Sequence, residues 1–184
     1  MSTTSWQAAL AVPVSPARDH IRGPVNAPVT LVEYGDYECP FCAAAHPVVE
    51  VVQQSMGPML RFVFRHFPLT TIHAHAEQAA EAAEAAGAQG KFWPMHAVLF
   101  ANQQRLEAPY LLNYAEALGL DAELFGADLA EHVHAPKVRE DFMSGVRSGV
   151  NGTPCFFING LRHDGSWDAA SLLAALQRAA QVSA

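Results

Sequence analysis

The chain has 184 residues, of which 51% are hydrophobic and 16% charged, and its formal net charge is -7 at pH 7. This length allows one well-buried core and is short for two domains. The 11 Lys and Arg residues are scattered and form no basic run. Neither nucleic acid nor an anionic membrane surface is therefore expected as a partner.

The first 26 residues are expected to form an extended arm, with the fold beginning near Ala27. They are rich in Ser, Thr, Pro and Gly and show no sustained hydrophobic period. They also lack the basic start and unbroken apolar core of a secretory signal peptide. No later segment approaches the roughly 18 apolar residues of a membrane span. A cytoplasmic location is therefore predicted, on the assumption that Met1 is the natural start.

Residues 27–74 are predicted to form a strand, a helix and a second strand. The run 29–34 is short, β-branched and apolar, as expected of a buried central strand, apart from one acid at Glu33. The motif at residues 39–42 then opens a segment with helical spacing of apolar residues. The alternating run 60–67 is the second strand.

Residues 75–148 show no convincing strand and are predicted to be a helical insertion, with alanine-rich periods broken by Gly and Pro. Residues 149–184 complete the fold. A strand from Cys155, a hairpin turn at Asn159-Gly160 and a last helix from about Asp168 are expected there. The order β-α-β, helices, β-β-α indicates an α/β domain.

Cys39 and Cys42 stand in a C-x-x-C spacing that redox and metal chemistry use. At the start of a helix, free backbone N–H groups and the helix dipole stabilise a thiolate, and the second sulfur lies within bonding reach. Cys39 is therefore the predicted attacking thiol and Cys42 the resolving one. The alternative is half of a zinc site, but such a site normally has four ligands in paired motifs, and this chain has one pair plus Cys155.

The arrangement resembles the DsbA-like branch of the thioredoxin superfamily. The resemblance rests on a strand, Cys39-Pro40-Phe41-Cys42, a helix, a helical insertion, and Gly152-Thr153-Pro154 before a hairpin and a terminal helix. It covers residues 27 to about 182. It implies a thioredoxin fold, in which helices flank a central mixed β-sheet, and thiol-disulfide oxidoreductase activity.

The resemblance also implies roles for single residues. Thr153 and Pro154 would be joined by a cis peptide bond, and together with Pro40 and Phe41 they would bind an extended substrate. Without the resemblance, Pro154 would be an ordinary proline at the entry of a strand.

Glu33 matches the superfamily's buried acid, six residues before the first cysteine. In that role a carboxylate with a raised pKa takes the proton of Cys42, whereas the alternative is a solvent-facing residue at the sheet edge. Phe41 replaces the His of the DsbA pattern and donates no hydrogen bond to sulfur, so a less oxidising couple than DsbA is expected. Pro40-Phe41 is also similar to the Pro-Tyr dipeptide of glutaredoxins, which makes glutathione a candidate co-substrate.

Cys155 directly follows Pro154, and the family's geometry places this position near the active-site sulfurs. Three interpretations stay open: an alternative disulfide with Cys39 or Cys42, a metal site with both, or a small apolar strand residue. The pairs His73-x-His75 and His132-x-His134 are poor metal sites, because a spacing of two points the rings apart on a helix. Surface or capping positions are expected for them.

The sequence thus predicts a thiol-disulfide oxidoreductase that exchanges disulfides with protein, peptide or small-thiol substrates. No metal and no organic cofactor are expected, and nothing in the sequence indicates an oligomeric state. Two other interpretations remain. One is a metal- or peptide-binding module without redox turnover, and the other is a glutathione-linked transferase or isomerase of the same fold, whose pattern lacks the resolving cysteine present here as Cys42.

Overall fold

The computed structural model describes residues 8–182, which fold around a five-stranded mixed β-sheet. Residues 1–7 of the predicted arm and 183–184 at the other end lie outside the described residues. The strand order is β1 (Ile21–Arg22), β3 (Leu60–His66), β2 (Val29–Gly35), β4 (Cys155–Ile158) and β5 (Leu161–His163). β2 pairs in parallel with β3 and antiparallel with β4. The strand that leads into the cysteine motif is therefore central.

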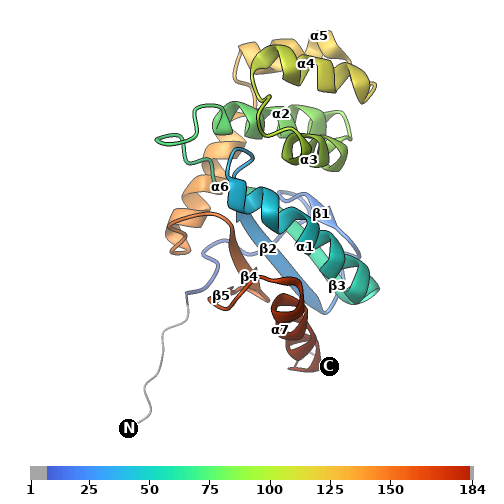
Figure 1. The fold of residues 1–184 in the computed structure, drawn as a ribbon, viewed down its shortest axis with the longest axis vertical. Helices are drawn as coiled ribbons and strands as arrows, with labels where there is room; N and C mark the ends of the chain where they lie inside the picture. The colour runs from blue at the N-terminus through green and yellow to red at the C-terminus, as the bar shows by residue number, and fades with distance from the viewer. Residues whose placement is uncertain (1–7, 183–184) are drawn as a thin grey trace.

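One face of the sheet is covered by α1 (Pro40–Met56) and α7 (Ala169–Val182), as Figure 1 shows. Strand residues alternate between faces, so Leu31, Phe62 and Phe156 point to this side and pack with both cysteines of the motif in one core. A short 3-10 turn, η1 (Gly57–Met59), joins α1 to β3. The first half of the fold thus places the cysteine motif above the central strand.

The helical insertion between β3 and β4 consists of five helices in the described chain. They are α2 (Ala76–Ala88), α3 (Phe92–Ala101), α4 (Ala108–Ala117), α5 (Ala122–Ala130) and α6 (Ala135–Arg147). The buried alanines of α2 let α3, α5 and α6 pack closely against it. The Asp121 side chain accepts a hydrogen bond from the Leu124 N–H at 3.0 Å and so caps the start of α5.

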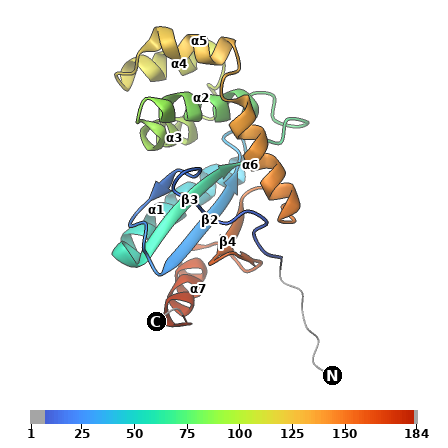
Figure 2. The same ribbon diagram turned by 180° about the vertical axis from the view of Figure 1, so that it is seen from behind.

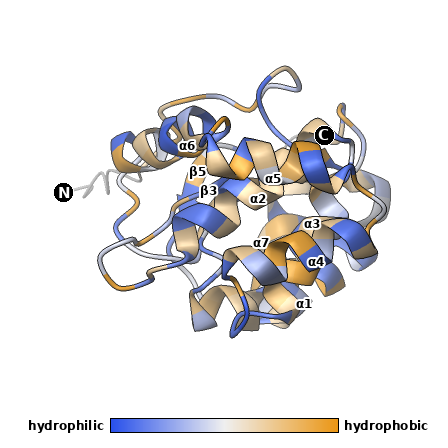
Figure 3. Cartoon of the chain, turned by 90° about the horizontal axis from the view of Figure 1, so that it is seen from above, coloured by the Kyte–Doolittle hydropathy of each residue, from blue (hydrophilic) through white to orange (hydrophobic). Residues whose placement is uncertain are grey.

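No helix among the described residues is both long and apolar enough to cross a membrane. In Figure 3 α1 and α6 carry hydrophilic as well as hydrophobic residues, as expected of helices with one face turned toward a core.

The predicted start of the fold near Ala27 is wrong, because the preceding segment is part of the sheet. Ala9 forms an antiparallel bridge with Leu161 at the β5 edge, and β1 pairs with β3 at the opposite edge. Between these points the segment crosses the face opposite α1, which α6 also covers (Figure 2). The segment from residue 8 to β1 is called the N-terminal strap below.

Arg65 is the physical reason for this course of the strap. Its side chain is completely buried, and its guanidinium donates hydrogen bonds to both carboxylate oxygens of Asp19, at 2.9 and 3.0 Å. It also donates to the Val12 carbonyl and to the Tyr34 hydroxyl. A buried guanidinium is tolerated only when its charge and its N–H groups are satisfied, so it holds the strap in place.

We expect Asp19→Ala to lower the free energy of unfolding by about 3–5 kcal/mol, because it leaves a buried guanidinium without its carboxylate. Glu140→Ala is the matched control. The Glu140 side chain is 53% exposed and pairs with Arg18, so its removal should cost less than about 1 kcal/mol. Urea denaturation followed by circular dichroism measures both changes, and two equally small losses would contradict the role given to the Arg65 ion pair.

Candidate dithiol site

The two cysteines of the motif lie at the start of α1. Cys39 is the N-cap residue, with extended backbone angles, and Pro40 is the first helical residue, where its missing N–H leaves no hydrogen bond unmade. Both thiols are free in this structure and both are buried, Cys39 with 3% exposure. The first sulfur therefore meets the unpaired N–H groups of the helix start, while the second lies beneath it in the core.

The environment separates the two thiols in acidity. The pKa of Cys39 is lowered from 9.0 to about 5, chiefly because the Cys42 thiol donates a hydrogen bond to its sulfur. Thr153 and the backbone N–H groups of Cys42 and Phe41 contribute further, and together these effects outweigh burial. Burial, with the bond to Cys39, raises the pKa of Cys42 far above its usual range. At neutral pH Cys39 is thus a thiolate and Cys42 a thiol.

Residues from three other parts of the chain contact the two sulfurs or the turn that carries them. The Asp36 N–H donates to Cys42 Sγ at 3.5 Å, and Cys39 Sγ lies 3.5 Å from the Thr153 carbonyl oxygen. The peptide bond between Thr153 and Pro154 is cis. The Gln103 side chain donates to the Cys39 carbonyl at 2.8 Å and to a second carbonyl in the same turn.

The predicted substrate-binding residues lie in two groups beside the dithiol. Pro40 and Phe41 form the exposed first turn of α1, where Phe41 keeps 63% of its surface accessible. Thr153 and Pro154 immediately precede β4 and are partly exposed. Both groups leave surface for a bound chain, and their role in substrate binding stays a prediction.

Glu33 lies beneath the dithiol on the central strand, paired in register with Phe64 and Phe156. It is only 2% exposed, so the alternative of a solvent-facing residue at the sheet edge is wrong. Burial, and then the negative charge of Cys39, raises the pKa of Glu33 from 4.5 to about 8. Among the described residues, none offers a hydrogen-bond partner to Glu33 Oε1. An unpaired buried carboxyl of this kind is typical of a functional group.

Cys155 does not lie with the other two sulfurs. It pairs in register with Tyr34 and packs with Val32 and Phe157, on the face of the sheet opposite α1. Burial raises the pKa of its thiol. The expected proximity to the dithiol is therefore corrected, because β-strand alternation turns residue 155 to the other side. The geometry supports the interpretation as a small apolar strand residue.

One buried cluster has ligand types suited to a metal. Suitable atoms of His66, Glu84 and Asp141 lie within 4.8 Å of one another. Asp141, however, already accepts hydrogen bonds from Arg18 at 2.9 Å and from Lys137 at 2.7 Å. These two cations neutralise the charge of the Asp141 carboxylate and occupy one of its oxygens, which a metal ion would need as a ligand. The cluster is therefore an ion-pair network within the core.

The two histidine pairs of the sequence do not form metal sites in the described chain. Each histidine instead contacts one carboxylate. The contacts are His73 with Asp36, His75 with Glu38, His132 with Glu81 and His134 with Asp128. Sequence reasoning did not select Asp36, Glu38 or Gln103. The equal spacing of Asp36-x-Glu38 and His73-x-His75 is the signal that could have found the first two.

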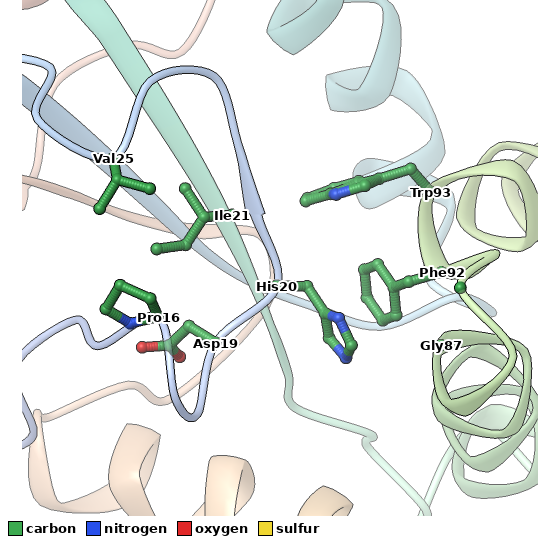
Figure 4. A pocket seen from close by; sticks show the side chains of 9 residues that line it. Pro16, Asp19, His20, Ile21, Val25, Gly87, Phe92 and Trp93 are labelled. Atoms are coloured by element: carbon green, nitrogen blue, oxygen red, sulfur yellow. The ribbon is translucent and has the colours of Figure 1, made fainter.

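A cavity of about 370 Å³ lies away from the dithiol, between the strap and the α2–α3 corner (Figure 4). His20 and Phe92 stack there with ring centroids 3.7 Å apart. Its other lining residues are Pro16, Asp19, Ile21, Val25, Gly87, Gly90 and Trp93. None of them is a cysteine, so this cavity is separate from the dithiol.

We expect Glu33→Gln to stabilise the reduced protein increasingly as the pH rises. Between about pH 4.5 and 8 the folded wild type keeps a proton on Glu33 that the unfolded chain releases, so its stability falls with rising pH. Gln does not titrate, so the stability of the variant relative to wild type should grow by roughly 2–5 kcal/mol between pH 5 and pH 8.

Urea denaturation with excess reductant measures this difference. Glu84→Gln is the control of opposite sign. Burial raises the pKa of Glu84, but hydrogen bonds from His20 and His66 lower it by more, so that variant should be destabilised at both pH values. A Glu33→Gln stability difference that does not change with pH would contradict the raised pKa.

The family model for Thioredoxin matches residues 16–178. Among curated relatives, the Na(+)/H(+) antiporter NhaA 1 of Salinispora arenicola is 51% identical over 170 residues, which is 92% of this chain and 26% of that protein. The Na(+)/H(+) antiporter NhaA of Herminiimonas arsenicoxydans is 45% identical over 168 residues, 91% of this chain and 27% of the relative. The chain thus spans about a quarter of the length of these relatives.

Solved structures with the same fold include oxidised BdbD from Bacillus subtilis, with a TM-score of 0.84 and 22% identity, covering 95% of this chain and 99% of that one. A thioredoxin-like oxidoreductase from Silicibacter pomeroyi DSS-3 has a TM-score of 0.77 and 29% identity, covering 91% and 94%. Wolbachia pipientis alpha-DsbA1 has a TM-score of 0.81 and 18% identity, covering 95% and 96%. These matches confirm the predicted fold. The chain therefore belongs to the thioredoxin family and has the DsbA-like form of its fold.

Proposed function

We propose that the chain is a thiol-disulfide oxidoreductase in which Cys39 attacks and Cys42 resolves. The observation that carries this proposal is the placement of the two sulfurs: Cys39 is the N-cap residue of α1, and the fully buried Cys42 lies in the first turn of the same helix. This placement lowers the pKa of Cys39 and raises that of Cys42. Thiolate character makes the first sulfur nucleophilic, and a protonated neighbour within bonding reach can displace the product. Membership of the thioredoxin family supports the same chemistry.

The reaction is written here in the direction of substrate reduction. The Cys39 thiolate attacks a substrate disulfide, which gives a mixed disulfide and releases the first substrate sulfur as a thiolate. Cys42 then loses its proton and attacks Cys39 Sγ, which forms the Cys39–Cys42 disulfide and releases the second substrate thiolate. Both substrate thiolates take up protons, and two electrons pass from the dithiol to the substrate. The reverse sequence oxidises a substrate dithiol.

Glu33 is proposed as the group that receives the proton of Cys42. Its carboxyl is buried beneath the dithiol, and its charge acts on Cys42. Part of its raised pKa comes from the Cys39 thiolate. When Cys39 enters a mixed disulfide this negative charge disappears, so Glu33 ionises more readily at the moment when a base is needed.

The direction of electron transfer depends on the potential and on the partner. The pKa of Cys39, about 5, lies between values of roughly 7 for thioredoxin and roughly 3.5 for DsbA. A lower pKa stabilises the reduced form and makes the couple more oxidising, so this value supports the predicted couple less oxidising than DsbA. A cytoplasmic location, which favours reduction, and glutathione as a co-substrate stay predictions.

We expect the purified chain to accelerate the reduction of insulin by dithiothreitol, followed as turbidity. Cys39→Ala should lower the rate to that without protein, because it removes the nucleophile. Cys155→Ala is the matched control and should keep the wild-type rate, since that thiol lies on the other face of the sheet. No acceleration by the wild type would contradict the proposed function.

The names of the relatives suggest a candidate partner, and we propose a Na(+)/H(+) antiporter in that role. Relatives between 45% and 51% identical carry this name, and this chain matches only about a quarter of their length. A partner protein embedded in a membrane does not require the chain itself to bind lipid, so the net charge of -7 is no obstacle.

Immobilised chain should retain the part of the Salinispora arenicola relative that it does not match, purified in detergent. The oxidised and reduced chains should differ in affinity if the dithiol takes part, and Cys39→Ala should abolish that difference. Retention no greater than on an unrelated acidic protein would contradict this partnership.

A further inference from the structure

The sequence D-Y-E-C that leads into the dithiol forms a turn at residues 36–39, here called the dithiol turn. A second segment, loop 67–75, connects β3 to α2 and lies against it. The two segments are far apart in the sequence, yet two acids of the turn meet two histidines of the loop. The contacts repeat with the same spacing of two residues on each side.

Asp36 makes the inner contact. Its carboxylate is completely buried and accepts hydrogen bonds from the Leu69 N–H at 2.8 Å and from His73 Nδ1 at 2.7 Å. Its other oxygen accepts from the Glu38 N–H at 2.8 Å. One side chain thus satisfies donors on both segments, and a buried carboxylate is stable in the core only with such partners.

Glu38 makes the outer contact, which is more exposed. One carboxylate oxygen accepts from the His75 N–H at 2.7 Å, and the other accepts from His75 Nδ1 at 3.0 Å. His75 directly precedes the first residue of α2. The start of the helical insertion is therefore tied to the dithiol turn.

The backbone of Asp36 reaches the dithiol itself. Its N–H donates to Cys42 Sγ at 3.5 Å, and its carbonyl accepts from the Cys39 N–H at 3.2 Å. The side chain fixes residue 36 against loop 67–75, while the main chain of the same residue contacts the resolving sulfur. A displacement of residue 36 would therefore move the group that orients Cys42.

We propose that the contacts of Asp36 with His73 and of Glu38 with His75 form a clamp that positions Cys42 for the resolving step, with Asp36 as its positioning residue. This inference rests on the proposed function. The Asp36 carboxylate does not touch a sulfur and acts through its own backbone N–H. Loosening the clamp should therefore slow the attack of Cys42 on Cys39. The first attack needs Cys42 only as a hydrogen-bond donor to the Cys39 sulfur, so it should change little at a pH well above the pKa of Cys39.

The test separates the two steps with one equivalent of dithiobis(nitrobenzoate), an aromatic disulfide whose released thiolate is coloured. Attack by Cys39 releases the first nitrothiophenolate and leaves a mixed disulfide. Attack by Cys42 releases the second, forms the Cys39–Cys42 disulfide and frees one proton. Stopped-flow absorbance records both phases in wild type, Asp36→Asn, His73→Ala and His73→Asn.

We expect Asp36→Asn and His73→Ala to slow the second phase about tenfold or more, because small displacements of reacting groups have effects of this size. At pH 8 the first phase should stay within about twofold of wild type, because Cys39, with a pKa of about 5, remains ionised there when its hydrogen bond from Cys42 weakens. His73→Asn keeps an N–H donor near the position of Nδ1 and should restore most of the rate. A second phase that is as fast in His73→Ala as in wild type overturns the clamp.

Asp128→Asn is the matched control. Asp128 and His134 form another partly buried imidazole–carboxylate contact of 3.0 Å, beside the start of α6 and away from the dithiol turn. It should leave both phases unchanged. An equal slowing in Asp128→Asn would show a general loss of stability and would also overturn the clamp.

Failure of the proposed function is recognised separately. Wild type could fail both to accelerate insulin reduction and to form the Cys39–Cys42 disulfide with dithiobis(nitrobenzoate). In that case the clamp is tested by the rates of hydrogen exchange of the backbone amides in residues 36–42 and 67–75. Faster exchange in His73→Ala that His73→Asn reverses supports it. Exchange equal to wild type in both segments overturns it.

Discussion

The position of Cys42 is the constraint on which the site depends. Its sulfur is buried at the start of α1, and its thiol hydrogen bond is the largest cause of the low pKa of Cys39. The reactive sulfur is thus activated by its own resolving partner. This requires the helix start to lie directly above the central strand, and the Gln103 amide holds that turn by donating to its carbonyls. The long helical insertion contributes to this arrangement through Gln103.

Buried acids in this fold fall into two groups. Asp19, Glu84 and Asp141 each contact a cation or histidines, so their charges are compensated within the core. Glu33 Oε1 lies in the same core without a hydrogen-bond partner among the described residues. An isolated buried carboxyl destabilises the folded state once it ionises. The raised pKa of Glu33 is the same effect seen in the titration of the group, because burial disfavours its charged form. The fold tolerates such a group directly beneath the dithiol.

Local patterns in the sequence were enough to predict the cysteine motif at a helix start, the central strand and the late hairpin. They failed where long-range contacts decide. Nothing in the composition of residues 8–22 indicates that Arg65 will bind Asp19 in the core. The face on which Cys155 lies depends on the register of β4 with β2. The sequence of β4 alone does not contain this register. The contact of Asp36 with His73 joins residues 37 positions apart, so only the fold brings them together.

The N-terminal strap also affects how this protein meets other chains. Exposed sheet edges carry unpaired backbone groups and can recruit a strand from another molecule. Here the strap pairs with β5 at one edge and forms β1 at the other. At one edge the outermost strand, β1, is only two residues long, and at the other edge Ala9 pairs with Leu161 of β5, so few backbone groups are left for a strand of another molecule. By holding the strap, the Arg65 ion pair therefore also helps to keep both sheet edges short.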